Sequence, residues 1–429
     1  MGIDFYTEIL TDIEFDIKYG HLSSIRIEFD SMAALRYGIV TYKSQRAGIL
    51  SELAGGGTRF LYDEGVTQSI ACALPATQRE HEYTFGLLPF FAHLAPEGWL
   101  RERQSAFADV DGNDDFGILL AFGADCIGAV GVVDPGHSHD RVRLRPSLTA
   151  IDAAAVNVER TISGVLAKIL CTDNGAGGYR PAGADEPAPH IAKYPGERLP
   201  DMVANEVTTL ELCRLLFGDE EVAEARLAVV DGVDGVDGLA LVADRFDRDA
   251  VGKLRCEDFA QVIAQPPGLD LKGKYSVGYD AIARALRHSV ARRLDARRLF
   301  KRLAAYVVLG NVDCHLKNWS LVETEEGMRL SPAYDVLNGY IYGAAGYTTR
   351  FGLLIGPERL QWERYDRALL LEIARELDLP VRAAEGVLRE LQNRGAALSK
   401  RLEGNLRLNE ERAWEYRNSV RAAWGRIYG

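Results

Sequence analysis

Residues 303–335 constrain the fold of this chain more than any other part of the sequence. An apolar run at 303–309 fits about two helical turns and leads directly into a polar loop that contains Asp313 and Asn318. Two short, strand-like runs follow at 319–322 and 329–330, and they lead to Asp335. The sequence therefore predicts a buried helix, a polar loop, a β-hairpin and a second polar loop, in that order.

The polar residues of these two loops are those that a phosphoryl-transfer enzyme requires. Asp313 can accept a proton from an attacking hydroxyl, and Asn318 and Asp335 can hold Mg²⁺ against nucleotide phosphates. The order Asp-x-x-x-x-Asn, hairpin, Asp is that of a kinase catalytic loop and metal-binding loop. His315 and Lys317 would add positive charge beside the base. Taken alone, the Asp–Asn spacing is weak evidence, and the competing interpretation is a polar loop that caps a helix.

Residues upstream could bind the rest of a nucleotide. Lys193 lies in the apolar strand-like segment 190–194, where a lysine is unexpected unless it reaches a partner. Glu206, in the following predicted helix, could orient Lys193 through an ion pair. The turn at Ser163 and Gly164 could cover phosphates with backbone N–H groups, although it lacks Gly-x-Gly-x-x-Gly and the Walker A pattern.

A predicted strand end at 241–248 is expected at the junction of two lobes. Backbone groups of Asp244 and Phe246 there could bond an adenine ring. Each nucleotide-binding candidate also has a plainer interpretation: an exposed lysine, a solvated helix face, an ordinary turn, or a surface Arg–Asp pair. The basic run from Arg284 to Arg302 could be a docking face for an acidic partner or nucleic acid, but a solvated helix face is the better interpretation.

The patterns divide the chain into three parts. Residues 1–145 are mostly short alternating segments broken by glycine, which predicts antiparallel hairpins, with a helix over about 88–106 and a helix-to-strand segment over 116–133. Residues 146–250 mix strands with a helix over about 202–216, and residues 251–429 are mainly helical apart from the hairpin. The predicted class is α+β: a bilobal, protein-kinase-like fold with a β-rich N-terminal subdomain, a mixed α/β nucleotide-binding N-lobe, and a C-lobe that is all helical apart from that hairpin.

Composition limits the environment of the protein. The net charge of −12 argues against a surface that binds nucleic acid throughout. The six cysteines form no Cys-x-x-Cys pair, which disfavours structural zinc and disulfides and favours a reducing cytoplasm. No signal peptide pattern is present, and no apolar stretch approaches the ~20 residues of a membrane helix. We therefore expect a cytoplasmic protein with no membrane partner.

Together these motifs resemble the HipA family of bacterial serine/threonine kinases, the toxin half of HipA–HipB toxin–antitoxin pairs. The resemblance covers most of the chain, and its motifs are specific through their order and spacing. The matching segments are Phe91-Ala-His-Leu-Ala-Pro96-Glu97-Gly-Trp-Leu-Arg101, Ile127-Gly128-Ala129-Val130, Ile162-Ser163-Gly164-Val165-x-x-Lys168, His190-Ile-x-Lys193, Asn205-Glu206, Arg245-Phe246-Asp247-Arg248, Glu257-Asp258-Phe259, Asp313-x-His315-x-Lys317-Asn318 and Tyr334-Asp335.

The resemblance implies a role for each matching position. Asp313 would be the catalytic base, with His315 and Lys317 beside it, and Asn318 and Asp335 would be the Mg²⁺ ligands. The residues that contact ATP would be Lys193, Ile162, Ser163, Gly164, Val165, Lys168, Asp244, Phe246 and Glu206.

The resemblance also implies regulation and partners. In the family a hydroxyl residue that opens the glycine-rich loop is autophosphorylated, which ejects the loop and inactivates the kinase. Thr161 occupies that place and Ser163 is close by, so either is a candidate phosphosite. The family further implies ATP and Mg²⁺ as cofactors, a protein substrate with a Ser or Thr hydroxyl, and a small helix-turn-helix antitoxin through which the protein meets DNA indirectly. Cys256 and the tyrosine-rich segment 339–347 depart from the family pattern without removing a catalytic group.

Two other functions stay open. A small-molecule kinase of the antibiotic- or sugar-phosphorylating type uses the same Asp-x₄-Asn…Asp arrangement, although a small substrate does not need the β-rich N-terminal subdomain. The third possibility is an inactive pseudokinase that serves as a co-repressor in an antitoxin–DNA complex. The presence of every catalytic group argues against that third function.

Overall fold

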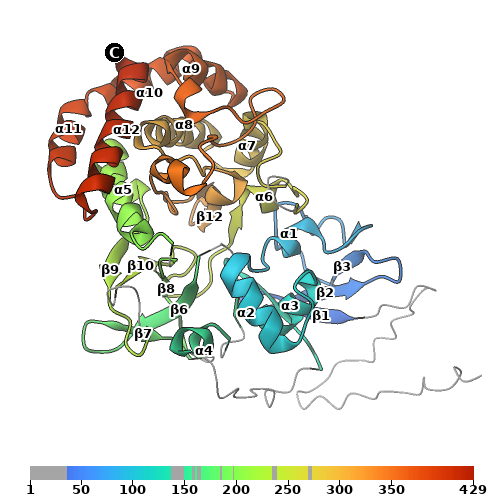
Figure 1. Cartoon of the computed structure of the whole chain (residues 1–429). Helices are drawn as coiled ribbons and strands as arrows, with labels where there is room; N and C mark the ends of the chain where they lie inside the picture. Colours follow the sequence, from blue (N-terminus) through green and yellow to red (C-terminus); the bar gives the residue numbers. More distant parts are fainter. Residues whose placement is uncertain are drawn as a thin grey trace, which may run out of the picture. The chain divides into compact units, whose positions relative to one another are not determined.

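The computed structural model describes residues 36–136, 149–156, 160–161, 166–183, 186–196, 198–233, 239–268 and 273–429. The predicted phosphate-loop residues Ile162, Ser163, Gly164 and Val165 lie outside these ranges. Figure 1 shows the described elements as two β-rich groups and a group of helices.

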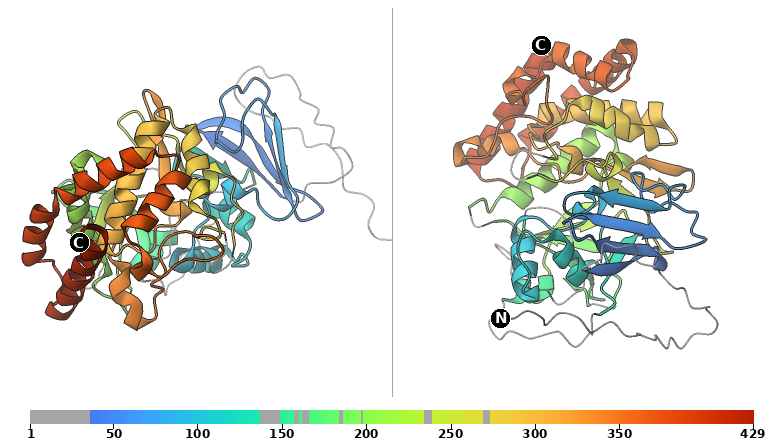
Figure 2. Two further views of the ribbon diagram at one scale, coloured as in Figure 1. Left: turned by 90° about the horizontal axis from the view of Figure 1, so that it is seen from above. Right: turned by 90° about the vertical axis from the view of Figure 1, so that its right-hand side faces the viewer.

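The N-terminal subdomain is an antiparallel sheet with three helices. Its strands are β1 (Tyr37–Tyr42), β2 (Gln45–Glu52), β3 (Thr58–Tyr62), β4 (Glu80–Tyr83) and β5 (Val130–Val133), in the order β4-β3-β2-β1-β5, and they lie side by side in the right-hand view of Figure 2. Alternation along β3 buries Phe60 and Tyr62 on one face of the sheet. The Phe60 ring lies 5.5 Å from that of Phe91.

The helix expected over 88–106 is in fact two helices. They are α1 (Pro89–Ala92) and α2 (Gly98–Ala108), and a third helix, α3 (Asp115–Phe122), precedes β5 as predicted. Pro96 lacks a backbone N–H, and Gly98 has a φ of +53°, so the intervening turn cannot continue a helix.

The N-lobe is a second antiparallel sheet, which carries Lys193 at its centre. Its elements are α4 (Ala150–Val156), β6 (Lys168–Asp173), β7 (Tyr179–Pro181), β8 (His190–Lys193), α5 (Met202–Phe217), β9 (Ala225–Ala228) and β10 (Ala240–Asp244). The strand order β7-β6-β8-β10-β9 makes β8 the central strand. Lys193 therefore lies directly opposite Lys168 on β6 and Leu241 on β10.

The C-lobe is mainly helical and contains one small sheet. Its helices are α6 (Phe259–Val262), α7 (Tyr279–Ala285), α8 (Arg292–Leu309), α9 (Arg367–Glu376), α10 (Val381–Gln392), α11 (Gly395–Glu403) and α12 (Glu410–Tyr428). The predicted apolar run 303–309 is at most 1% exposed in α8. The expected hairpin is β12 (Ser320–Thr324) and β13 (Gly327–Leu330), and β11 (Cys256–Asp258) adds a third strand that the sequence did not reveal.

The basic run 284–302 is largely neutralised by ion pairs within the fold. Arg284 pairs with Asp280, and Arg292 with Asp378. Near the end of the run, Lys301 and Arg302 are buried and contact Glu221 at 3.1 and 3.4 Å. The run is therefore partly a structural ion-pair cluster, which weakens its interpretation as a docking face.

The three predicted parts share their hydrophobic cores. Leu100 of α2 packs with the N-lobe sheet, while Leu212 and Phe217 of α5 pack with the C-lobe helices. The boundary expected near residue 145 lies outside the described ranges, so the three-part division stays a prediction. Within the described residues, no helix is long and apolar enough to span a membrane.

Candidate active site

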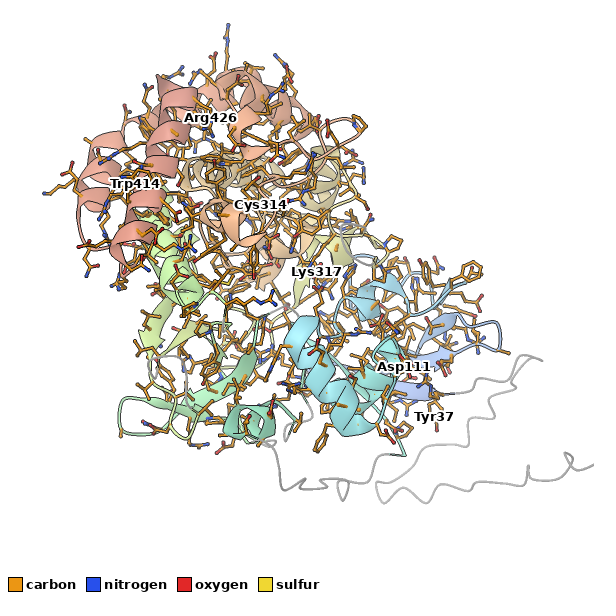
Figure 3. All side chains as sticks on the ribbon, in the orientation of Figure 1. Tyr37, Asp111, Cys314, Lys317, Trp414 and Arg426 are labelled. Atoms are coloured by element: carbon orange, nitrogen blue, oxygen red, sulfur yellow. The ribbon has the colours of Figure 1, made fainter. Side chains whose placement is uncertain are left out.

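A cavity of about 450 Å³ is lined by residues from both lobes and from the N-terminal subdomain. This volume falls within the range of small-molecule sites. The sequence-predicted residues that line it are Asp313, His315, Lys317, Asn318, Asp335, Lys193, Lys168, Glu206, Asp244 and Phe246. Figure 3 shows Lys317 where the C-lobe meets the N-terminal subdomain. The structure thus brings together residues that are separated by up to two-fifths of the chain.

The loop that carries Asp313 begins at a glycine that ends α8. Gly310 adopts a φ of +73°, and a Cβ at this position would lie 2.4 Å from Asn338 Oδ1. Only glycine fits both requirements. The turn delivers Asp313 to the cavity, where the Tyr275 hydroxyl donates a hydrogen bond to Asp313 Oδ1.

His315 is a buried, neutral side chain rather than the expected positive charge. Burial lowers its pKa to about 4, despite the opposing effect of Asp313. Its Nε2 lies 4.0 Å from Asp313 Oδ2, and its ring packs edge-on against Tyr275, with 4.9 Å between ring centroids. The lysine of this loop, Lys317, also lines the cavity, and its Nζ donates to Glu97 Oε1 at 2.7 Å.

Asn318 and Asp335 place an amide oxygen and a carboxylate at the cavity wall, which are oxygens of the kind that hard metal ions bind. Asn318 Nδ2 donates to the Asp313 carbonyl at 2.7 Å, which stabilises the loop and leaves the amide oxygen as the group able to bind a metal. Asp335 has a φ of +55°, a strained conformation that is typical of functional sites. A carboxylate and an amide oxygen suit Mg²⁺, which usually takes further ligands from phosphates and water. No cluster of three or more His, Cys, Asp or Glu forms a metal site within the described ranges.

Lys193 links the two lobes through a pair of ion pairs. Its Nζ lies 2.7 Å from Glu206 Oε1 on α5 and 2.7 Å from Asp335 Oδ1. Burial opposes the charged forms, but the attraction between the partners raises the pKa of Lys193 and lowers that of Asp335. Burial and the facing charge of Lys193 lower the pKa of Lys168 to about 8. The ion pair that the sequence suggested between Lys193 and Glu206 is therefore present.

Fewer polar groups are available to an adenine at the end of β10 than the sequence suggested. The Asp244 N–H already donates to the Glu224 carbonyl at 2.9 Å. The Asp244 carboxylate is held by His190 at 2.8 Å and by Arg226 at 2.9 Å. The Phe246 N–H makes no backbone hydrogen bond within the described residues, and the Asp244 carbonyl lies two residues before it, so a donor and an acceptor at this strand end could face a base.

Thr161 occupies a buried position outside the cavity lining. It is 1% exposed, and its hydroxyl has no hydrogen-bond partner within the described residues. Its main-chain N–H donates to the Asp125 carbonyl at 3.4 Å. Phosphorylation of Thr161 would therefore require this residue to leave its present position. The other candidate phosphosite, Ser163, lies outside the described residues.

Four residues of the site had no role assigned from the sequence. Tyr275 contacts Asp313, Glu97 and Lys274 form ion pairs at the cavity wall, and Asn205 bonds the backbone after Asp335. Lys274 and Tyr275 lie in an irregular loop, where no periodicity gives a signal. Glu97 and Asn205 were visible only as parts of family-like motifs.

Two family models match the chain and together cover most of it. The HipA-like C-terminal domain matches residues 160–398, more than half of the chain, and the HipA N-terminal domain matches residues 38–133. The chain belongs to the HipA family. The fold agrees with a solved complex of HipA, HipB and operator DNA from the Shewanella oneidensis MR-1 toxin–antitoxin system, with a TM-score of 0.67 and 18% identity over 91% of this chain and 96% of that chain.

Curated relatives match over part of their length. The putative kinase Y4dM of Sinorhizobium fredii is 33% identical over 277 residues, which is 61% of this chain and 64% of that protein. The serine/threonine-protein kinase toxin HipA of Shewanella oneidensis is 24% identical over 286 residues, 59% of this chain and 63% of that protein. The chain therefore spans less than two thirds of these relatives.

Proposed function

We propose that this HipA-family protein is an ATP- and Mg²⁺-dependent protein serine/threonine kinase that acts as the toxin of a toxin–antitoxin pair. The observation that carries the proposal is a single cavity in which Lys193 contacts both Glu206 and Asp335, with Asn318 and Asp313 in the same wall. These are the parts that phosphoryl transfer requires, in the order that kinases use.

Each residue of the cavity would have its own role in phosphoryl transfer. Asp313 would accept the proton of a Ser or Thr hydroxyl as that oxygen attacks the γ-phosphate, while Tyr275 fixes one oxygen of the base. Lys193 would bind the α- and β-phosphates, and its ion pair with Glu206 would hold it in position. Asn318 and Asp335 would hold Mg²⁺, which when bound neutralises phosphate charge. The nucleotide base would lie against the Asp244 carbonyl and the Phe246 N–H.

The same assignment extends to regulation and partners. Autophosphorylation at Thr161 or Ser163 would inactivate the kinase by displacing the phosphate loop. The solved relative is a complex with HipB and operator DNA, which supports a small helix-turn-helix antitoxin as the partner here, with DNA met indirectly through it. The substrate would be a protein in the cytoplasm.

Paired substitutions test the phosphotransfer centre. Asp313→Asn and Asp335→Asn keep the side-chain shape, and asparagine tolerates the left-handed backbone of residue 335. Each should lower the transfer of label from ATP to protein by at least about 100-fold and should abolish growth arrest on expression. The matched control is Asp378→Asn, because Asp378 is also left-handed, with a φ of +57°, and pairs with an exposed arginine outside the cavity.

The outcomes separate the competing functions. Full activity in Asp313→Asn would exclude Asp313 as the base. Label that appears in small molecules and not in protein bands would favour a small-molecule kinase. Failure of the wild-type protein to bind Mg·ATP in calorimetry would favour a pseudokinase.

A further inference from the structure

Glu97 occupies a helix position for which its side chain is poorly suited. It is the N-cap residue of α2, yet its carboxylate makes no capping hydrogen bond. N-cap positions favour Ser, Thr, Asp and Asn, whose short side chains accept from the first N–H groups of the helix. A residue that breaks a local rule often serves a function elsewhere. The turn formed by Pro96 and the left-handed Gly98 directs the Glu97 side chain away from its own helix.

The Glu97 carboxylate bridges two lysines of the C-lobe. Its Oε1 accepts from Lys317 Nζ at 2.7 Å, and its Oε2 accepts from Lys274 Nζ at 2.7 Å. The side chain of Glu97 is 30% exposed, while those of Lys317 and Lys274 are 8% and 19% exposed. Burial opposes ionisation, but the two lysines outweigh it and hold the pKa of Glu97 well below its usual range. The carboxylate is therefore ionised at neutral pH.

Both lysines belong to segments that carry or hold the catalytic base. Lys317 lies in the loop of Asp313 and directly precedes Asn318. Lys274 directly precedes Tyr275, whose hydroxyl donates to Asp313. All three members of the bridge line the cavity. Through one carboxylate, Glu97 thus contacts both of the loop segments that determine where Asp313 lies.

The bridge also sets the charge at this end of the cavity. Two lysines and one glutamate carry a net charge of +1, whereas the lysines alone would carry +2 and would repel each other. Lysines that are not held by Glu97 would turn toward the phosphates of a bound nucleotide, because phosphates are the strongest anions that the cavity can receive. Such an orientation strengthens binding of the nucleotide in the ground state and does not stabilise the transition state.

We propose that Glu97 is a positioning residue of the active site: it holds Lys317 and Lys274 in the orientation that phosphoryl transfer requires and limits their attraction for the nucleotide. This inference rests on the proposed kinase function. It makes the N-terminal subdomain part of the catalytic centre, since this subdomain supplies the carboxylate that bridges the two lysines in the described part of the chain.

The test measures nucleotide affinity and kcat separately in Glu97→Gln. This substitution keeps the size of the side chain and removes its charge. Affinity for Mg·ADP, measured by calorimetry, should rise about 3- to 10-fold, because Lys317 and Lys274 no longer pair with a carboxylate and attract the phosphates more strongly. The rate constant kcat for phosphate transfer to protein should fall about 10-fold, because the base loop and the lysines lose their alignment. Raising the salt concentration should shrink the gain in affinity. Glu97→Asp, which restores the charge, should return the affinity to near the wild-type value and recover part of kcat.

The control is Lys43→Met, which breaks another ion pair between the N-terminal subdomain and the C-lobe. Lys43 Nζ lies 2.8 Å from Glu323 Oε1, and neither residue lines the cavity. This variant should match the wild type in both measurements. The proposal is overturned if Glu97→Gln also matches the wild type, or if its affinity and kcat fall together with its melting temperature. A wild-type protein that transfers no phosphate would instead overturn the proposed function, so the two failures are distinct.

Discussion

Asp313 offers its two carboxylate oxygens to different neighbours. Oδ1 accepts the Tyr275 hydroxyl, while Oδ2 faces His315 Nε2 at 4.0 Å and is not held as closely. Tyr275 is itself fixed, because it is 9% exposed and the Arg359 guanidinium lies 4.2 Å from its ring centroid. In the proposed function, this hydrogen bond would hold Asp313 at one oxygen and keep the other oriented toward a substrate hydroxyl.

Tyr275→Phe removes this hydrogen bond and keeps the ring. We expect kcat to fall about 10-fold, because Asp313 gains rotational freedom, while the free energy of unfolding falls by only about 1 kcal/mol. Phosphorylation kinetics and urea unfolding measure the two effects.

Tyr306→Phe is the matched control for the loss of a buried hydroxyl. Tyr306 is 1% exposed, and its hydroxyl has no hydrogen-bond partner within the described part of the chain. This variant should retain full kcat. Equal losses of kcat in both variants would show that Tyr275 acts through packing alone.

Individual residues of the site were predictable when the sequence around them made their residue type or position conspicuous. Lys193 interrupts an apolar strand, and Asp335 follows a hairpin, so each was conspicuous in the sequence. Tyr275 and Glu97 were not, because their partners lie 38 and up to 220 residues away and no periodic pattern links them. The charge of His315 was predicted wrongly, since residue type alone does not report burial.

Helix α5 connects Lys193 to the loop that carries Asp335. Glu206 on this helix pairs with Lys193, and its neighbour Asn205 bonds the backbone after Asp335. Asn205 Oδ1 accepts from the Asn338 N–H at 2.9 Å, and its Nδ2 donates to the Asn338 carbonyl at 3.1 Å. The helix therefore fixes both sides of the site relative to each other.

Asn205→Ala should loosen this connection. It leaves a main-chain N–H and a carbonyl buried without partners, which should lower the free energy of unfolding by about 2–4 kcal/mol. Affinity for Mg·ADP should also fall, because the Asp335 loop is no longer held. Urea unfolding and calorimetry test these effects.

The control on the same helix is Glu211→Gln. Glu211 pairs with Arg401 and Arg407 near the surface, so its loss should cost less than about 1 kcal/mol. If Asn205→Ala is no more destabilising than this control, the Asn338 contact does not fix the loop.

The elements themselves were largely predictable from periodicity. The strand at 190–193, the helix at 202–217 and the hairpin at 320–330 agree with the alternation or helical period of their residues. The helix expected over 88–106 was wrong at Pro96 and Gly98. Strand β11 was missed because three residues carry no periodic signal, and it exists only through pairing with β12.

At the scale of the whole molecule, the N-terminal subdomain meets the C-lobe through buried polar contacts. His93 Nε2 donates to the Gln265 carbonyl at 2.7 Å. Burial, followed by the charge of Lys317, lowers the pKa of His93 to about 4. Between pH 4 and about 6.5 the unfolded chain binds this proton and the folded protein does not, so the contribution of His93 to stability is lost as the pH falls through this window.

Comparison of the wild type with His93→Gln isolates this effect. Glutamine can donate to the same carbonyl but does not titrate. The stability of the wild type relative to the variant should fall by about 2 kcal/mol between pH 7.5 and pH 5, as measured by urea unfolding. Asp258, whose pKa burial raises to about 6, acts in the opposite direction but is common to both proteins. An unchanged difference between the two pH values would show that His93 accepts a proton in the folded state.

The arrangement of the three parts was predictable only by resemblance to a family. Periodicity indicates which residues of α2 and α5 are buried, but it does not say that Leu100 packs with the N-lobe or Phe217 with the C-lobe. Contacts between such distant segments depend on the shapes of the surfaces that meet. Two family models and a solved fold confirm the HipA-like architecture that the motifs suggested.

Glu97 and Lys317 are separated by 220 residues, which has a consequence for the newly made chain. A ribosome that adds ~5–20 residues per second needs roughly 10–45 s to cover this distance. For that time the first sheet has emerged, while the segment with Asp313 has not yet been made. A translation product that stops early therefore contains the subdomain but lacks the cavity residues Asp313, Asn318 and Asp335.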